Sequence, residues 1–327
     1  MPAVPAAQTC PYGCGAELSG VALTASENML GTGGSFRYAR CPACASLVLL
    51  DVPEDLSPFY PRDYYSFDTP TSPEPGAVTG ALMAGLLRLP WLARCAGRSR
   101  WQGRLFPVSA GWFAGLGVTQ RSRVLEVGTG GGAVLGQLRR LGFTDLVGID
   151  PYLDAEERTW GPITIRRQSL GEVDEPADVI LFHHVLEHVA DPVDELRRAR
   201  ELLRPGGHVL VVVPLADSAA LECYGASWVQ LDAPRHLTVP TEAGLTAGAR
   251  TAGLGLVEHW RTGTALQFWG SEQYMRGIPL ADARSWHRSP EASPWTARQV
   301  ERWSRRARRL NAAGRGDEGA FVLRPVA

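Results

Sequence analysis

Short apolar runs alternate with segments of helical periodicity through the second half of the chain. Runs of four or five apolar residues predict buried strands, and apolar positions three and four residues apart predict the helices between them. The expected strands are Val124–Val127, Leu146–Ile149, Ile163–Arg166, Val179–Phe182, Val209–Val213, Gly253–Arg261 and Gly319–Arg324. Strands that alternate with helices are typical of a parallel sheet with helices on both faces. The pattern therefore predicts an α/β domain with a doubly wound, Rossmann-like sheet of seven strands.

The same pattern divides the chain into three predicted parts. They are residues 1–68, with two cysteine pairs and an aromatic segment; residues 69–120, a linker and a helical segment that would cap a ligand pocket; and residues 121–327, the strand–helix domain. An insertion at about residues 265–316 precedes the last strand. It holds an arginine-rich segment at Trp295–Leu310, for which we predict a helix.

A glycine-rich loop follows the first expected strand. Gly128, Gly130 and Gly132 let the backbone turn tightly and approach a ligand closely. Helical spacing begins at Ala133, so the loop joins a strand to a helix N-terminus, whose free N–H groups favour a carboxylate or phosphate. We predict a cofactor loop. The glycines also fit the dinucleotide fingerprint, with Asp150 near the expected distance, so they leave a nicotinamide cofactor open.

Three further motifs in this order resemble those of the class I S-adenosylmethionine (SAM) methyltransferases. Glu126 lies two residues before the first glycine, Phe182-His-His-Val-Leu-Glu-His188 follows the fourth strand, and Leu203-Arg-Pro-Gly-Gly207 leads into the fifth. The resemblance implies an enzyme of that family with SAM as its cofactor. It assigns the cofactor contacts to Glu126, Gly128, Thr129, Gly130, Gly132, Asp150, Pro151, Ser169, Leu170 and His183.

The resemblance also gives these positions roles. In that family the acid and the glycines hold the methionine end of the cofactor, and the acid after the second strand binds the ribose hydroxyls. Ser169 and Leu170 would contact adenine, and the triplet Leu186-Glu-His188 would open the helix after the fourth strand. The string from His184 to His188 also matches the inverted zinc-protease pattern H-x-x-E-H. Its place within a methyltransferase order argues against that interpretation.

Two cysteine pairs near the N-terminus have the spacing of a zinc ribbon. We predict that Cys10, Cys14, Cys41 and Cys44 hold one zinc ion. Four thiolates leave no open coordination position, so the zinc would be structural. The alternatives are free thiols or two disulfides. Cys95 and Cys223 stand alone in the sequence, and we expect both to be buried apolar residues.

Residues 214–240 are expected to form the acceptor pocket. The string Pro234-Arg-His-Leu resembles one found in bacterial methyltransferases of the ubiquinone-biosynthesis-like group. It also aligns with a Tyr-x-Glu-His string of zinc-ribbon sugar C-methyltransferases, although Ala233 and Arg235 replace the tyrosine and the glutamate. His236, His184 and Tyr224 are the candidate general bases. We predict methyl transfer to an oxygen or nitrogen atom of a small molecule, including sugar-linked molecules and secondary metabolites.

Composition limits the other classes of function. A net charge of −1 and a pI near 6.7 give no overall attraction to nucleic acid or anionic membrane. We find no signal peptide or membrane-spanning pattern, and we expect a cytoplasmic protein. The ribbon would form a wall of the active site or a homodimer contact. The alternatives are a sugar-nucleotide C-methyltransferase, a peptide or RNA methyltransferase that docks through the arginine-rich helix or the zinc ribbon, and a non-catalytic partner with this fold.

Overall fold

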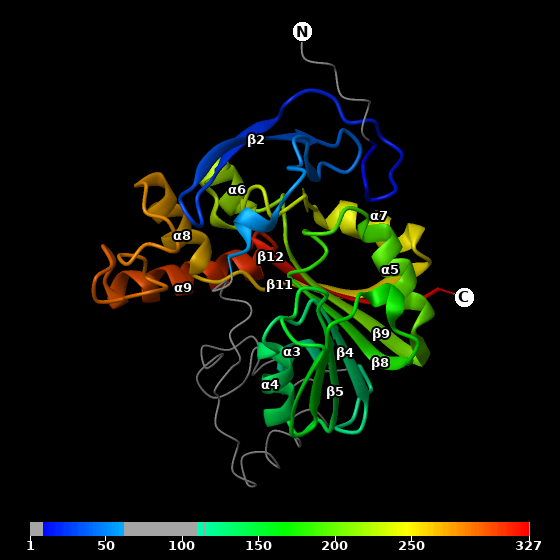
Figure 1. Cartoon of the computed structure of the whole chain (residues 1–327). Coiled ribbons are helices and arrows are strands. Elements are labelled where there is room, and N and C mark those ends of the chain that lie inside the picture. The colour runs from blue at the N-terminus through cyan, green and yellow to red at the C-terminus, as the bar shows by residue number, and fades with distance from the viewer. Residues whose placement is uncertain (1–8, 62–109, 114–115, 327) are drawn as a thin grey trace. The chain divides into compact units, whose positions relative to one another are not determined.

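The computed structural model describes residues 9–61, 110–113 and 116–326 (Figure 1). Most of the predicted linker and helical cap, the end of the aromatic segment and Cys95 lie outside these residues. The chain forms two compact units. The first contains residues up to Pro61 together with 184–196 and 212–321, and the second contains residues 62–183, 197–211 and 322–327. The domain boundaries expected from the sequence stay a prediction.

The large sheet contains eight strands in the order β11-β12-β9-β8-β4-β5-β7-β6. Their bounds are Arg123–Val127 (β4), Asp145–Ile149 (β5), Glu157–Trp160 (β6), Ile163–Arg166 (β7), Ala177–His183 (β8), Leu203–Pro214 (β9), Leu254–Arg261 (β11) and Glu318–Pro325 (β12). Within the second unit β4 pairs in parallel with β5 and β8, and β5 pairs in parallel with β7. All seven expected strands are present. The predicted α/β fold with a mostly parallel sheet is therefore confirmed.

Two features of this sheet differ from the sequence prediction. β6 was not expected, because it carries charged and polar residues in place of an apolar run; it pairs antiparallel with β7 at the sheet edge. β9 begins at Leu203, six residues before the predicted start. Gly207 permits this extension, since a Cβ atom there would lie 2.9 Å from the carbonyl oxygen of Asp178 on β8.

The described residues contain seven α-helices. They are α3 (Ala110–Phe113), α4 (Ala133–Arg140), α5 (Pro192–Glu201), α6 (Ala219–Tyr224), α7 (Glu242–Thr251), α8 (Leu266–Met275) and α9 (Ala297–Ala312). The arginine-rich helix is confirmed as α9, which begins after Thr296, whose hydroxyl accepts a hydrogen bond from the backbone N–H of Gln299. Among the described residues, no helix combines the length and the apolar character that crossing a bilayer requires.

A four-stranded sheet lies in the first unit, at the top of Figure 1. It has the order β1-β2-β3-β10, with bounds Leu23–Glu27 (β1), Gly33–Arg40 (β2), Leu47–Leu49 (β3) and Thr238–Val239 (β10). β10 pairs antiparallel with β3, so residues from the second half of the chain complete the N-terminal sheet. This pairing holds the segment that carries His236 against the ribbon.

Apolar packing strengthens the same junction. Tyr38, Leu47 and Leu49 from the ribbon share one buried cluster with Trp228 and Val239. Burial of large apolar side chains is the main stabilising contribution in folding. The ribbon and the segment before α7 therefore pack as one body within the first unit.

Candidate functional site

The glycine loop forms the turn that the sequence predicts. Gly128, Gly130 and Gly132 have φ angles of 62°, 52° and 80°, a region that glycine adopts without steric cost. The loop ends β4, and Gly132 precedes the first residue of α4. A side chain at Gly132 would also meet Trp160 and Ile165. The backbone N–H groups at the start of α4 thus follow directly on a turn that only glycine fits.

Two buried acids meet at this loop. Glu126 on β4 accepts a hydrogen bond of 2.6 Å from the hydroxyl of Thr129, and burial raises the pKa of Glu126 to about 8. Asp150 follows β5, and its carboxylate accepts hydrogen bonds from the backbone N–H of Gly130 at 3.0 Å and of Tyr152 at 2.9 Å. Burial also raises the pKa of Asp150. Because β4 and β5 are parallel neighbours, the two acids lie together at the carboxyl ends of these strands.

The remaining predicted cofactor residues follow neighbouring strands of the second unit. His183 ends β8, and its ring lies 5.1 Å from the ring of Trp112. Ser169 lies just after β7 and donates its hydroxyl to Glu172 at 2.7 Å, while Leu170 is buried. Pro151 is exposed. All ten residues therefore lie in the second unit, in the last residues of β4 and β8 or just after the carboxyl ends of β4, β5 and β7.

His184, the first candidate base, is held between two carboxylates in the first unit. Its Nδ1 lies 3.1 Å from Glu187 and its Nε2 lies 2.9 Å from Glu318. Burial opposes the charged ring, but these two acids raise the pKa of His184 to about 10. Its φ of 55° is unusual for a residue with a side chain. A histidine that already holds its proton so tightly is poorly suited to removing one from an acceptor.

His236, the second candidate base, lies in a buried group with Glu187 and His188. Its ring centroid is 4.6 Å from that of His188, and its Nε2 lies 4.0 Å from Glu187 and 3.9 Å from Asp232. Burial and the neighbouring His188 lower the pKa of His236 to about 4, against the two carboxylates. The ring is therefore neutral at pH 7.

Glu187 is the acid at the centre of this group. Burial by itself would raise its pKa, but the hydrogen bond and charge of His184, with smaller effects of His236 and His188, lower the pKa to about 2. The triplet Leu186-Glu-His188 lies in a turn rather than in a helix, since α5 begins at Pro192. The expectation that this triplet opens the helix is therefore wrong.

Arg235 is fully buried beside His236. Its guanidinium donates to Asp232 at 2.8 and 2.6 Å, to Glu27 at 2.7 Å and to the carbonyl oxygen of Phe59 at 3.2 Å. Burial by itself would raise the pKa of Asp232, but Arg235 holds it below its usual value. Arg235 thus fixes Asp232 next to His236 and ties both to the end of β1.

Tyr224, the third candidate base, lies apart from these contacts in the sequence and the structure. It ends α6, and its hydroxyl donates to Glu272 on α8 at 3.3 Å. Burial and the charge of Glu272 raise its pKa. A phenol that holds its proton more tightly than usual is a weaker base candidate than a neutral imidazole.

The four ribbon cysteines converge. Their Sγ atoms lie 3.6 Å apart between Cys10 and Cys44, 3.4 Å between Cys14 and Cys41, and 3.9 Å between Cys14 and Cys44. A tetrahedral zinc ion with Zn–S bonds of about 2.3 Å separates its sulfur atoms by roughly 3.8 Å. The cluster fits one zinc ion and is too open for disulfides. Cys223 is exposed, so the expectation that it is buried is wrong.

Hydrogen bonds connect the cysteine cluster to the segment after His236. The hydroxyl of Thr241, the N-cap of α7, donates to the carbonyl oxygen of Cys44 at 2.5 Å, and the backbone N–H of Thr241 donates to Ser46 at 3.1 Å. The hydroxyls of Tyr12 and Thr238 lie 2.9 Å apart. β10 and the N-cap of α7 are therefore fixed by the cysteine-containing end of the ribbon.

The group of Glu187, His188 and His236 is called the histidine cluster. Sequence reasoning missed several of its members and neighbours. Glu187 and His188 were visible in the H-x-x-E-H string, but that string alone does not show that His236 joins them from residues much later in the chain. Arg235 lies in the string Pro234-Arg-His-Leu, and Asp232 lies two residues before that string. Glu27 gave no signal, because a single acid at the end of a short strand is common.

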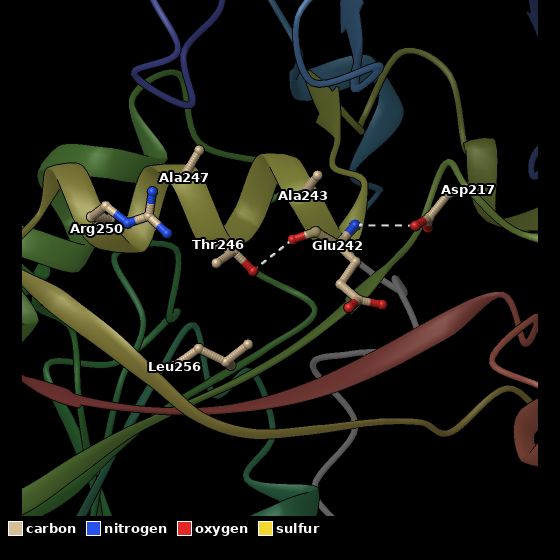
Figure 2. Close-up of a pocket in the computed structure, with 7 residues that line it drawn as sticks. All are labelled: Asp217, Glu242, Ala243, Thr246, Ala247, Arg250 and Leu256. Carbon is tan, nitrogen blue, oxygen red and sulfur yellow. Dashed lines mark hydrogen bonds between the residues drawn. The ribbon is translucent and has the colours of Figure 1, made fainter.

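A pocket of about 630 Å³ lies beside α7 (Figure 2). Its lining residues are Asp217, Glu242, Ala243, Thr246, Ala247, Arg250 and Leu256. In it the Thr246 hydroxyl donates to the Glu242 carbonyl oxygen, and the Glu242 N–H donates to Asp217. None of the predicted site residues lines this pocket, so the candidate site lies elsewhere.

Comparison with known proteins identifies similar chains. A family model described as a methyltransferase domain matches residues 100–259. The ubiquinone biosynthesis O-methyltransferase of Cereibacter sphaeroides is 36% identical over 129 residues, which cover 36% of this chain and 51% of the relative. The protein of the same name from Paracidovorax citrulli is 32% identical over 172 residues, which cover 46% of this chain and 71% of the relative. The chain thus spans about half the length of the first relative and about seven tenths of the second.

Solved structures are similar at a lower level. The cyclopropane synthase MmaA2 from Mycobacterium tuberculosis has a TM-score of 0.42 and 16% sequence identity, and the likeness covers 69% of this chain and 88% of that chain.

Proposed function

This chain belongs to the class I S-adenosylmethionine-dependent methyltransferases, and we propose that it transfers a methyl group from SAM to an oxygen or nitrogen atom of a small-molecule acceptor. One observation carries the proposal: Glu126 and Asp150 meet at the glycine loop, and Asp150 accepts a hydrogen bond from Gly130. A carboxylate fixed at the end of β5 is suited to the two hydroxyls of a ribose. The glycine turn lets the backbone approach the rest of the cofactor closely.

The residues of the second unit would hold the cofactor. We assign the methionine end to Glu126 and the glycine loop, the ribose to Asp150, and the adenine to Ser169 and Leu170. SAM supplies a methyl group on a positively charged sulfur atom. The protein then has to orient the acceptor and exclude water, because proximity and orientation supply much of the rate in such displacements.

We assign activation of the acceptor to His236. Its Nδ1 lies 2.9 Å from the carbonyl oxygen of Gln230, so Nδ1 carries the proton and Nε2 has a free lone pair. The neutral ring can accept the proton of an acceptor hydroxyl or amine at Nε2. Asp232 and Glu187, each about 4 Å from Nε2, would stabilise the charged ring that results. His184 would act through Glu187 as a positioning residue.

An oxygen acceptor is favoured within this proposal. Both similar enzymes are named as O-methyltransferases, and the sugar C-methyltransferase alternative lacks support at two positions. Ala233 has no ionisable group, and Arg235 is fully engaged by Glu27 and Asp232. In the ribbon, the four cysteines would hold a structural zinc ion that keeps the segment around His236 in place.

The test is release of S-adenosylhomocysteine by the zinc-loaded protein with SAM and a panel of acceptors. The panel should contain phenols, sugar hydroxyls, amines, a sugar nucleotide and RNA. We expect turnover with a phenol, hydroxyl or amine, and loss of at least 100-fold in His236→Gln. Turnover only with RNA, or methylation of a carbon atom of the sugar nucleotide, would contradict the proposed acceptor. Tight cofactor binding without turnover on any acceptor would support a non-catalytic partner.

A further inference from the structure

Three side chains that can bind a metal ion converge in the first unit, away from the cysteines. One ligand atom each from Glu187, His188 and His236 lies within 4.8 Å of the other two. Glu187 and His236 are buried, and His188 is half-buried. Buried groups of this kind indicate a metal site better than exposed acids do, because a charge or lone pair without a partner is costly in the interior.

Both imidazole rings are oriented as in metal sites. The Nδ1 of His236 lies 2.9 Å from the carbonyl oxygen of Gln230, and the Nδ1 of His188 lies 2.9 Å from the carbonyl oxygen of Arg235. A carbonyl oxygen only accepts, so each Nδ1 carries the hydrogen and each Nε2 keeps its lone pair. The hydroxyl of Tyr60 is 3.1 Å from the same Nδ1 of His188. Metal-binding histidines almost always donate their other ring N–H to a carbonyl or carboxylate in this way.

The carboxylate of the group has an unused oxygen. Oε1 of Glu187 contacts His184, whereas the buried Oε2 has no hydrogen-bond partner among the described residues. Asp232 adds a second, partly buried carboxylate 3.9 Å from Nε2 of His236. Arg235 is shared between Asp232 and Glu27, and His184 lies between Glu187 and Glu318. Four carboxylates therefore face two cationic side chains, and a metal cation would offset the excess negative charge.

We propose that Glu187, His188 and His236 form a second metal site, which binds a divalent transition-metal ion. Two imidazoles and one carboxylate suit Zn²⁺, Co²⁺, Ni²⁺ or Fe²⁺, and leave coordination positions open for water or an acceptor oxygen. Bonds of about 2.1 Å separate the ligand atoms of such an ion by roughly 3 to 4 Å. The ligand atoms lie within 4.8 Å of one another, so the group needs to contract by up to about 1 to 2 Å, which side-chain rotation can supply.

This site differs in kind from the cysteine cluster, because it offers nitrogen and oxygen ligands in place of sulfur. Binding of the ion does not depend on the proposed function, but its role in catalysis rests on it. With an ion bound, His236 is a ligand rather than a base. The ion would then lower the pKa of an acceptor hydroxyl, as metal ions do for bound water.

The experiment uses the full chain with its cysteine site loaded with zinc. Binding of Co²⁺ is followed by titration calorimetry and by visible absorption, without SAM or acceptor. We expect one further ion per chain, with weak bands and no thiolate charge-transfer band, because sulfur is not a ligand. His236→Gln and Glu187→Gln should each weaken binding by at least 10-fold, in line with the loss of one ligand. His259→Gln is the matched control, since His259 pairs with Glu242 instead.

Two results would overturn the proposal. One is the absence of a second ion at millimolar Co²⁺ in wild-type protein that binds S-adenosylhomocysteine. The other is unchanged binding of that ion in His236→Gln. If Glu187→Gln fails to fold, His188→Gln replaces it, and its far-ultraviolet circular dichroism shows whether it is folded. Failure of methyl transfer on every acceptor would leave the metal result standing, so the two hypotheses fail separately.

Discussion

The guanidinium of Arg235 donates a hydrogen bond of 2.7 Å to Glu27, although 208 positions separate the two residues in the sequence. Both side chains are fully buried. The pair joins the end of β1 to the residue next to His236, and Asp232 shares the same guanidinium. The ribbon therefore supplies a buried carboxylate that pairs with a buried guanidinium of residues 214–240.

We expect Arg235→Met to lower the free energy of unfolding by about 3–5 kcal/mol. Removal of one partner leaves the carboxylates of Glu27 and Asp232 buried without compensation, and that penalty is large. Urea unfolding followed by circular dichroism measures it. Arg37→Met is the control, because its pair with Asp51 is exposed and should contribute little. Equal effects of the two substitutions would contradict the role assigned to Arg235.

Cys41→Ser should remove the ribbon zinc and loosen the segment around β10. One of four thiolates is lost, and structural zinc sites contribute directly to folding. Mass spectrometry of the native protein should show loss of one zinc ion, and hydrogen exchange should rise at Thr238 and Val239, which pair with β3. Cys223→Ser is the matched control, since Cys223 is exposed. Unchanged zinc content in Cys41→Ser would rule out the four-cysteine site.

The sheet could be predicted from the sequence where the strands are apolar. β4, β5 and β8 read as buried runs because both of their faces are covered. β6 could not be found in this way, since an edge strand does not need an apolar face. β10 is two residues long, and only its pairing with β3 gives it strand geometry. Long-range pairing of this kind leaves no periodic signal in the sequence.

The proposed cofactor residues could be found in the sequence more readily than the proposed acceptor residues. Glycine turns and the acid after a strand are local features, so Gly130 and Asp150 are visible in a short motif. The histidine cluster depends on contacts between distant segments. The sequence shows His184 and His236 as equal candidates for the general base. Only the structure shows that both ring nitrogens of His184 contact carboxylates, those of Glu187 and Glu318. Its pKa follows from those partners and not from its neighbours in the chain.

We expect Asp150→Ala to weaken binding of SAM and S-adenosylhomocysteine by roughly 100-fold. A carboxylate that accepts two hydrogen bonds from ribose contributes about 1.5–3 kcal/mol for each bond to a charged group. Calorimetric titration measures the change directly. Asp154→Ala, an exposed acid of the same loop, is the control and should bind as wild type does. If both variants bind normally, the ribose is held by other residues.

The stability of the first unit should depend on pH through Asp317. Its side chain is fully buried, Oδ2 accepts hydrogen bonds from Trp228 and Gln230 at 3.1 Å each, and Oδ1 has no partner among the described residues. Burial raises the pKa of Asp317 to about 7, against those hydrogen bonds. The folded protein therefore holds a proton that the unfolded chain has released above its ordinary pKa near 4.

The sign of the effect follows from this difference. The stabilisation is fully present below about pH 4, is lost as the pH rises toward 7, and changes little above that value. Asp317→Asn keeps an acceptor for Trp228 and Gln230 without a charge, so it should raise the free energy of unfolding at pH 8 by an amount on the order of 2 kcal/mol. At pH 4 it should have little effect. Urea unfolding at both pH values measures the difference. A variant that is less stable than wild type at pH 8 would show that Asp317 is held as a charged group, and that its unpaired oxygen finds a cationic partner.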